Sequence, residues 1–172
     1  MRKIIVSIFL VLNFLCSCSE RSETALDWFN KAKALNYTDQ KKAIEYLNNA
    51  IKLQPDYAMA YGNRGNAFAD IGQYQRAIED YNKVILLHPD YASAYNNKGT
   101  AYAGLGQYQH AIEDYDKAIL LKPNDADAYN NKGTAYAELG QYQHAIEDYD
   151  KAIRLKTDYA SVFYTTKLLT VV

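Results

Sequence analysis

Apolar residues recur along most of this chain at spacings of three and four, which place them on one face of an α-helix. Between residues 58 and 159 this pattern runs through three gapless units of 34 residues, and the last two units differ at six positions. Each unit holds two apolar stripes separated by a Gly-Gln pair, which predicts a helix, a glycine-terminated turn and a second helix. The pattern therefore predicts an all-α fold built from repeated helix pairs.

Small and aromatic residues alternate on the predicted faces. In the middle unit, Tyr95, Gly99 and Tyr102 share one face of the first helix, and Ala111 and Tyr115 lie on the second. Small residues allow two helices to cross closely, and aromatic rings fill the gaps beside such a crossing. One helix pair cannot bury both of its faces, so we expect the pairs to stack.

This arrangement resembles the tetratricopeptide repeat family. The residues of the middle unit that carry the resemblance are Tyr95, Gly99, Tyr102, Gly106, Gln107, Tyr108, Ala111, Tyr115, Ala118 and Pro123. The resemblance covers most of residues 24–159 and implies a right-handed α-solenoid of stacked antiparallel helix pairs. It divides the chain into a degenerate first repeat at 24–57, repeats at 58–91, 92–125 and 126–159, and a partial repeat or capping helix at 160–172.

The first twenty residues follow a different pattern. Arg2 and Lys3 precede an apolar run that is typical of a secretory signal peptide and too short for a good membrane span. The next residues, Leu15-Cys16-Ser17-Cys18, resemble a bacterial lipobox, which implies a signal peptide at 1–17, a lipid on Cys18 and a tether at 18–23. An ordinary cleaved signal and an uncleaved anchor stay open as alternatives. We expect a lipid-anchored chain in the bacterial cell envelope, outside the cytoplasm, with the outer membrane or cell surface favoured.

Charge and chemistry-bearing residues exclude several function classes. The net charge of -1 does not favour nucleic acid. Cleavage before Cys18 leaves no second cysteine for a disulfide or zinc site. His110 and His144 occupy equivalent places in two repeats, so we interpret them as products of duplication. We expect no cofactor, no metal site and no enzymatic activity.

Repeated charges on the predicted helices are interpreted as surface features. We expect the acidic pair Glu113-Asp114 and its equivalents to be solvated, with lysines four residues after each glutamate as neighbours. Arg64, Lys98 and Lys132 form a basic row, whose aliphatic stems we expect in the seams while the charges reach water.

The resemblance also implies a groove lined by first helices, which in the family binds extended peptides or partner helices. The candidate groove residues are Asn63, Asn66, Asn96, Asn97, Thr100, Asn130, Asn131 and Thr134. A carboxylate clamp is disfavoured, because the places of its cations fall on Gly62, Asp127 and Asn131. An asparagine ladder of Asn63, Asn97 and Asn131 could bond a peptide backbone, or those amides could satisfy neighbouring backbone instead.

The sequence thus predicts a membrane-tethered scaffold that binds a protein or peptide. One alternative is an assembly factor for an envelope complex, pilotin-like or acting in outer-membrane assembly. Another is a structural array that self-associates through the apolar C-terminal end, Leu168–Val172. That end could instead pack on Ala145–Arg154 of its own chain.

Overall fold

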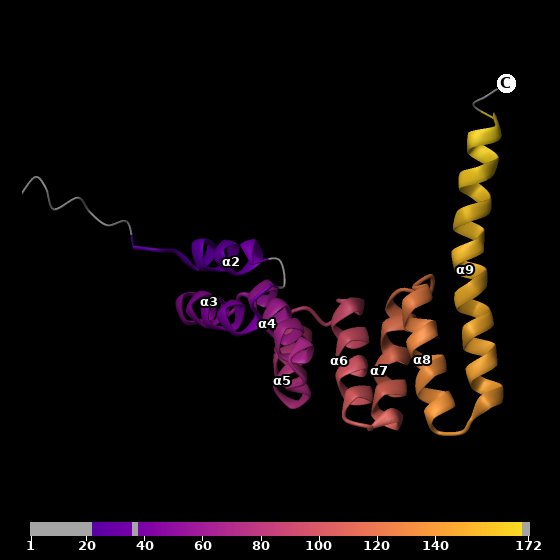
Figure 1. Ribbon diagram of the computed structural model, residues 1–172, viewed down its shortest axis with the longest axis horizontal. Coiled ribbons are helices and arrows are strands. Elements are labelled where there is room, and N and C mark those ends of the chain that lie inside the picture. The colour runs from indigo at the N-terminus through magenta and orange to yellow at the C-terminus, as the bar shows by residue number, and fades with distance from the viewer. Residues whose placement is uncertain (1–21, 36–37, 170–172) are drawn as a thin grey trace, which may run out of the picture.

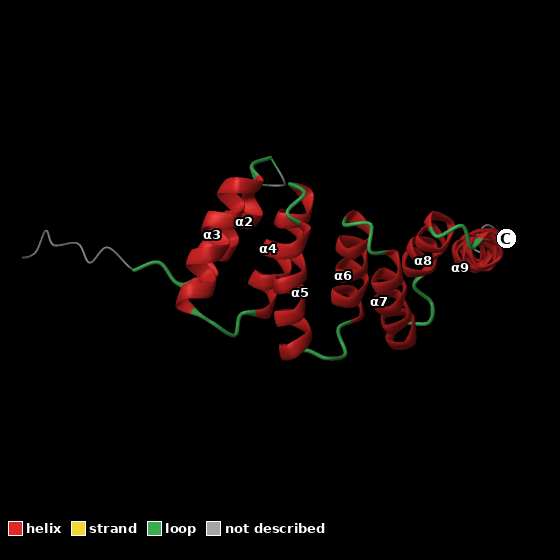
Figure 2. Ribbon diagram, turned by 90° about the horizontal axis from the view of Figure 1, so that it is seen from below, coloured by secondary structure: helices red, strands yellow, loops and turns green. Residues whose placement is uncertain are grey.

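The part of the chain that the structure describes forms eight helices, which follow one another in chain order along the long axis (Figure 1). The structure, a computed structural model, describes residues 22–35 and 38–169. Within those residues it contains helices and short connections but no strand (Figure 2). The helices are α2 (Ala25–Ala34), α3 (Gln40–Leu53), α4 (Ala58–Asp70), α5 (Tyr74–Leu87), α6 (Ala92–Gly104), α7 (Tyr108–Leu121), α8 (Ala126–Glu138) and α9 (Tyr142–Leu169). The fold is therefore an α-solenoid of stacked helix pairs.

Each helix packs mainly against the helices before and after it in the chain. First helices also touch across the stack, because α4 contacts α6 and α6 contacts α8. The predicted signal segment, Cys18 and most of the predicted tether lie outside the described residues. None of the described helices combines the length and apolar character that crossing a membrane requires.

Glycine ends each inner first helix by adopting a backbone conformation that other residues rarely adopt. Gly106 has a φ of 71°, its N–H donates to the Ala103 carbonyl at 2.9 Å, and the Gln107 N–H donates to the Tyr102 carbonyl at 2.9 Å. This pair of bonds is the Schellman motif, which satisfies the last carbonyls of a helix. The same turn recurs at Gly72 and Gly140, so all three inner hairpins reverse in the same way.

A second kind of glycine permits the two helices of a hairpin to cross closely. A Cβ atom on Gly99 would lie 2.7 Å from Tyr115 Cε1 and 3.0 Å from the Ala111 carbonyl oxygen. The ring of Tyr115 is 2 % exposed and fills the space above the missing side chain. Gly65 and Gly133 hold the same relation to Tyr81 and Tyr149.

Buried ion pairs join the two helices of each inner hairpin, contrary to the expected solvated surface. The Arg64 guanidinium donates from Nη2 to Asp80 Oδ1 at 2.6 Å and from Nε to Oδ2 at 2.8 Å, and its Nη1 donates to Asn48 Oδ1 at 2.6 Å. These three residues come from α4, α5 and α3, so the contact links two hairpins. The ion pair recurs within the next hairpins as Lys98–Asp114 at 3.0 Å and Lys132–Asp148 at 3.2 Å. The link to the preceding hairpin recurs too, because Lys98 Nζ donates to Asn82 Oδ1 at 3.4 Å and Lys132 Nζ donates to Asp116 Oδ1 at 3.1 Å.

The prediction for the acidic pairs is therefore half wrong. Glu79 is exposed, but Asp80 is only 4 % exposed, because one residue turns a helix by about 100° and brings the aspartate into the seam. Burial raises the pKa of the Asp80 carboxyl above its ordinary value, although Arg64 opposes the shift. The basic row accordingly does not send its charges to water; they end on these carboxylates.

The last helix also departs from the predicted layout. Second helices α3, α5 and α7 end just before Pro55, Pro89 and Pro123, where proline cannot continue a helix comfortably. Thr157 stands at the equivalent place in the last repeat, and α9 continues through it to Leu169. The backbone of residues 160–169 is thus part of the same continuous helix α9.

Filling the close crossing should destabilise the fold. We expect Gly99→Ala to lower the free energy of unfolding by about 1–3 kcal/mol, because the new methyl group overlaps Tyr115 and a backbone carbonyl. Gly62→Ala is the matched control, since its Cβ would meet only Val84 Cγ2 at 3.8 Å. That change should stabilise the helix by about 0.5–1 kcal/mol. Urea denaturation followed by circular dichroism checks both values, and equal effects would contradict the close-crossing argument.

Removing one partner of a buried ion pair should lower the free energy of unfolding more than replacing both partners with apolar residues. We expect Asp80→Ala to lower the free energy of unfolding by about 3 kcal/mol, because Arg64 loses its carboxylate in a largely buried place. The double variant Arg64→Met/Asp80→Leu should stay within about 1 kcal/mol of the parent, since neither charge is then buried. Asp90→Ala, at an exposed loop residue, is the control. A double variant as unstable as Asp80→Ala would show that the pair contributes net stability.

Candidate functional site

A cavity of about 450 Å³ lies between the successive first helices α4 and α6, with α5 as its floor. Met59 and Gly62 line it from α4, Tyr81 and Val84 from α5, and Asn97 from α6. Gly62 has no side chain to fill the cavity, and Met59 lies at its rim with 60 % of its surface exposed. The cavity thus combines an apolar floor with amide groups on its walls.

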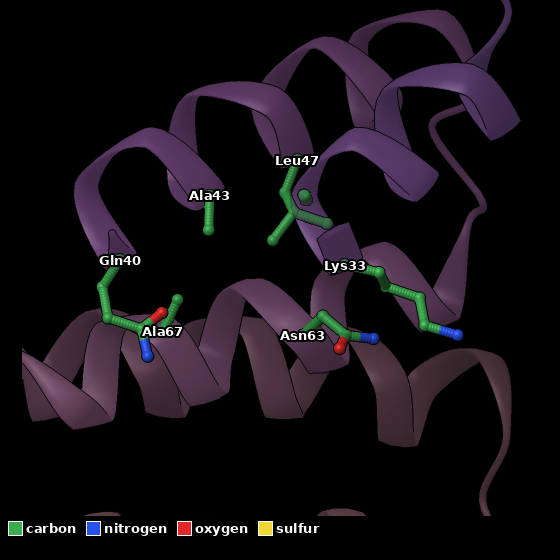
Figure 3. Close-up of a pocket in the computed structure, with 7 residues that line it drawn as sticks. Lys33, Gln40, Ala43, Leu47, Asn63 and Ala67 are labelled. Atoms are coloured by element: carbon green, nitrogen blue, oxygen red, sulfur yellow. The ribbon is translucent and has the colours of Figure 1, made fainter. Parts of the chain in front are cut away.

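Two further hollows continue this cavity along the stack. One, of about 320 Å³, shares Asn66, Tyr81 and Asn97 with it and extends to Thr100. The other, of about 140 Å³, lies between α2, α3 and α4 and shares Asn63. Figure 3 shows Lys33 and Asn63 at one end of this smaller hollow and Gln40 and Ala67 at the other. Each smaller hollow shares lining residues with the cavity between α4 and α6, and we call the three hollows together the first-helix groove.

Asn66 is the centre of the polar contacts in the groove. Its Oδ1 accepts hydrogen bonds from Tyr81 Oη at 2.8 Å and from Asn97 Nδ2 at 3.1 Å. Burial raises the pKa of the Tyr81 hydroxyl far above its ordinary value, so the hydroxyl stays neutral and keeps donating at any physiological pH. The side chain of Asn66 is thereby held in one orientation between α4, α5 and α6.

Four of the eight predicted groove residues line the hollows, namely Asn63, Asn66, Asn97 and Thr100. The other four lie on the first helices α6 and α8. There, Asn131 Nδ2 donates to Asn96 Oδ1 at 3.2 Å, and Thr134 Oγ1 donates to the Asn130 carbonyl at 3.0 Å. These groups are tied to neighbouring helices or to their own backbone.

The three asparagines of the predicted ladder are not equivalent in the structure. Asn63 Nδ2 donates to the Met59 carbonyl of its own helix at 2.8 Å, whereas Asn97 and Asn131 donate to asparagines of the preceding first helix. Their amide nitrogens are thus engaged within the protein, partly as the alternative interpretation expected. An Asn carbonyl oxygen can still accept a hydrogen bond from a peptide N–H, and an Asn nitrogen carries a second proton.

Sequence reasoning missed the floor and one end of the groove. Tyr81 and Val84 belong to a second helix, whose apolar stripe predicts packing between helices but not a groove floor. His88 and Tyr91 line the cavity from the connection between α5 and α6. A sequence signal for the floor does exist, because Val84 lies three residues after Tyr81 on the same apolar face of the second helix. No sequence pattern singles out His88 in the connection between α5 and α6.

The two repeated histidines lie apart from the groove contacts described above. His110 stacks on Tyr102 with ring centroids 5.3 Å apart, and His144 stacks on Tyr136 at 5.0 Å. In the preceding repeat, Arg76 lies over Phe68 at 4.0 Å in the same position. Within residues 22–35 and 38–169, no three His, Cys, Asp or Glu side chains gather in a place that could hold a metal ion.

Sequence comparison identifies the repeat directly. Family profiles described as tetratricopeptide repeat match residues 28–57, 46–79, 92–125 and 126–159, and one described as TPR repeat matches 65–106. The chain belongs to the tetratricopeptide repeat family. No matching sequence was found among curated proteins.

Solved tetratricopeptide repeat (TPR) structures share this fold. One crystal structure of MamA is 29% identical with a TM-score of 0.76, covering 87% of this chain and 86% of that chain. Another is 30% identical with a TM-score of 0.73, covering 80% and 75%. The first TPR of Spaghetti (RPAP3), bound to the HSP90 peptide SRMEEVD, is 24% identical with a TM-score of 0.66, covering 69% and 95%. This last likeness shows the shared fold alone.

Proposed function

We propose that this TPR protein is a membrane-tethered scaffold that holds an extended peptide segment of a protein partner in its first-helix groove. The observation that carries the proposal is the cavity between α4 and α6, where an apolar floor lies beneath oriented amides. Amide groups can bond the backbone of an extended peptide without reading its sequence closely. The partner is a protein of the bacterial cell envelope.

The lining of the cavity indicates the chemistry of the bound segment. Met59 and Val84 offer an apolar surface, and neither lysine nor arginine lines the cavity between α4 and α6. A strongly acidic segment would find no charge-assisted hydrogen bond there. The RPAP3 structure shows that a TPR fold can hold a peptide. We infer that this groove takes a neutral segment with an apolar side chain at its centre.

The tether is the second part of the proposal. The first-repeat helix α2 begins with a capping box, in which the Asp27 N–H donates to Thr24 Oγ1 at 3.2 Å and the Thr24 N–H donates to Asp27 Oδ2 at 2.9 Å. Thr24 follows the lipobox-like Cys18 by six residues. A lipid on Cys18 would therefore hold the array close to the membrane surface, with the groove available to envelope proteins.

A photo-crosslinker at Met59 should capture the partner. We expect replacement of Met59 by benzoylphenylalanine to give one defined adduct in intact cells of the source organism, because this rim position is exposed beside the cavity. A second change, Gly62→Leu, should reduce that adduct at least tenfold by filling the cavity. The readout is the adduct seen on a denaturing gel and identified by mass spectrometry.

The matched control for this capture is the same probe at Leu120, which is 71% exposed and does not line the three hollows. It should not give the Met59 adduct. Equal capture at both positions, or capture that Gly62→Leu leaves unchanged, would count against the groove as the binding site.

Lipidation is tested separately at the two cysteines. We expect Cys18→Ser to abolish incorporation of labelled palmitate and to release the chain from the membrane fraction, because the acceptor thiol is lost. Cys16→Ser is the matched control and should keep both properties. Palmitate labelling that survives Cys18→Ser would refute lipidation at Cys18. If the Met59 probe still captured its partner in that case, the groove would bind the partner without this anchor.

A further inference from the structure

The seam between α7 and α8 joins two hairpins through a polar contact, an apolar contact and an ion pair. These contacts are Tyr108–Glu138, Ile112–Ala135 and Asp116–Lys132. They are spaced by four residues along α7 and by three along α8, as one face of each antiparallel helix requires. At the centre of the seam Ile112 is 3 % exposed and Ala135 is 1 % exposed. The two helices thus meet in one fixed register.

The same register recurs in the other seams between hairpins. An isoleucine of the second helix shares a buried cluster with an alanine of the next first helix, and an amide oxygen four residues after the isoleucine accepts from a cation three residues before the alanine. The apolar members are Ile78 with Ala101 and Ile44 with Ala67, and the polar members are Asn82 with Lys98 and Asn48 with Arg64. Every described seam therefore uses the same two half-faces.

The last second helix, α9, carries one half-face without its cover. Gln141–Ile153 is identical in sequence to Gln107–Ile119 of α7. On α9, however, Tyr142 is 67% exposed, Ile146 is 52% exposed, and Asp150 is exposed as well. The backbone of α9 runs on as one helix for 28 residues, so its continuation does not turn back over these three side chains. The covered face of α7 shows which chemistry fits here: a helix with a cation and, three residues later, an alanine.

The first helix of the array, α2, carries the other half-face without its cover. The small residues that face the second helix of each hairpin align α2 with α8, and this alignment matches Ala32 to Gly133, Lys31 to Lys132 and Ala34 to Ala135. The Lys132 side chain is 15% exposed in its seam, whereas that of Lys31 is 44% exposed, and Ala34 is exposed too. α2 is the first helix that the structure describes, and it has the cation and the alanine that α9 requires, at the required spacing.

We infer that α9 of one copy of this chain binds α2 of a second copy, so that successive copies continue the solenoid end to end. In this contact Lys31 approaches Asp150 of the other copy, and Ala34 packs on Ile146, in the register that α8 takes on α7. Each copy has one end of each kind, so the contact is heterologous and can repeat from copy to copy. The first-helix groove takes no part in it.

The charges of the two ends are complementary. Within one copy Lys31 forms an ion pair with Glu23, so Asp150 of the other copy would be its second carboxylate. One lysine of this fold already holds two carboxylates, because Lys132 Nζ lies 3.1 Å from Asp116 Oδ1 and 3.2 Å from Asp148 Oδ1. The end-to-end contact therefore repeats an arrangement that the chain forms inside its own array.

The match covers the C-terminal half of α2. Inner first helices bury an alanine near their start, at Ala60, Ala94 and Ala128, each at most 3 % exposed. α2 has Asp27 at that place, where it caps the helix with Thr24. The contact between copies is thus shorter than an inner seam, and we expect assembly to increase with the concentration of the chain.

Disulfide trapping between two different variants tests the contact. We expect a mixture of full-length Ala34→Cys and Ile146→Cys, oxidised mildly in detergent, to give a covalent dimer, because the equivalent residues Ala135 and Ile112 lie in one cluster. Each variant alone should give roughly tenfold less dimer, since two cysteines are bridged only when their Cα atoms lie within about 7 Å. Mass spectrometry should find residue 34 joined to residue 146.

The matched control is a mixture of Ala34→Cys with Leu86→Cys, whose site on α5 is 71% exposed and lies outside the seams. It should give roughly tenfold less dimer than the Ile146→Cys mixture. The parent chain measures the background from Cys16 and Cys18.

Charge reversal tests the register. We expect Asp150→Lys, added to Ile146→Cys, to lower trapping with Ala34→Cys about fivefold, because Lys31 then meets a like charge. Lys31→Asp, added to Ala34→Cys, should restore trapping with the Asp150→Lys chain, since the pair is again of opposite charge. Circular dichroism should show unchanged helix content, because both side chains are exposed in the single chain.

Three outcomes would overturn the proposal. The first is trapping of Ile146→Cys with itself as efficient as in the mixture, which would indicate a symmetric pair of α9 helices. The second is equal trapping with Leu86→Cys, and the third is trapping that charge reversal leaves unchanged. Gly62→Leu in both chains should not alter the dimer, so failure of this contact and failure of the groove are distinguished; a dimer lost with Gly62→Leu would mean that copies meet through the groove instead.

Discussion

The close crossing of the two helices in each hairpin is the contact on which the rest of the structure depends. Gly99 carries no side chain, so the ring of Tyr115 can lie flat against its helix. The same crossing at Gly65 brings the Tyr81 hydroxyl through the hairpin to Asn66, on the groove side. One steric constraint thus sets both the packing of the core and the orientation of the polar groups that a ligand would meet.

The packing of the two helices in each inner hairpin also depends on a second, electrostatic constraint. Asp80, Asp114 and Asp148 are buried, and each receives a cation from the first helix of its own hairpin. A buried carboxylate without such a partner would be costly, so only a packing of the two helices that keeps the pair is favourable. Arg64 also reaches Asn48 of the preceding hairpin, which connects this local pairing to the neighbouring repeat.

The two ends of the array differ in a way that bears on function. At the start, Thr24 and Asp27 cap α2 with polar groups, next to the segment that we propose to carry a lipid. At the other end, α9 presents Tyr142, Ile146 and Ile153 to solvent. A scaffold anchored at its capped end would hold the first-helix groove near the membrane surface.

The sequence by itself determined the repeat, the helix pairs, their glycine turns and the candidate groove side, because each depends on spacings within one 34-residue unit. It did not determine which member of the Glu79-Asp80 pair is buried, nor that Tyr81 forms the groove floor. It also did not show that Asn97 bonds to Asn66 of the preceding repeat. Only the tertiary structure decided these points, because burial and pairing depend on a neighbouring helix that lies outside any local pattern. Ile112 and Ile146 show this most directly, since they hold the same place in two identical stretches, Gln107–Ile119 and Gln141–Ile153, but are 3 % and 52% exposed.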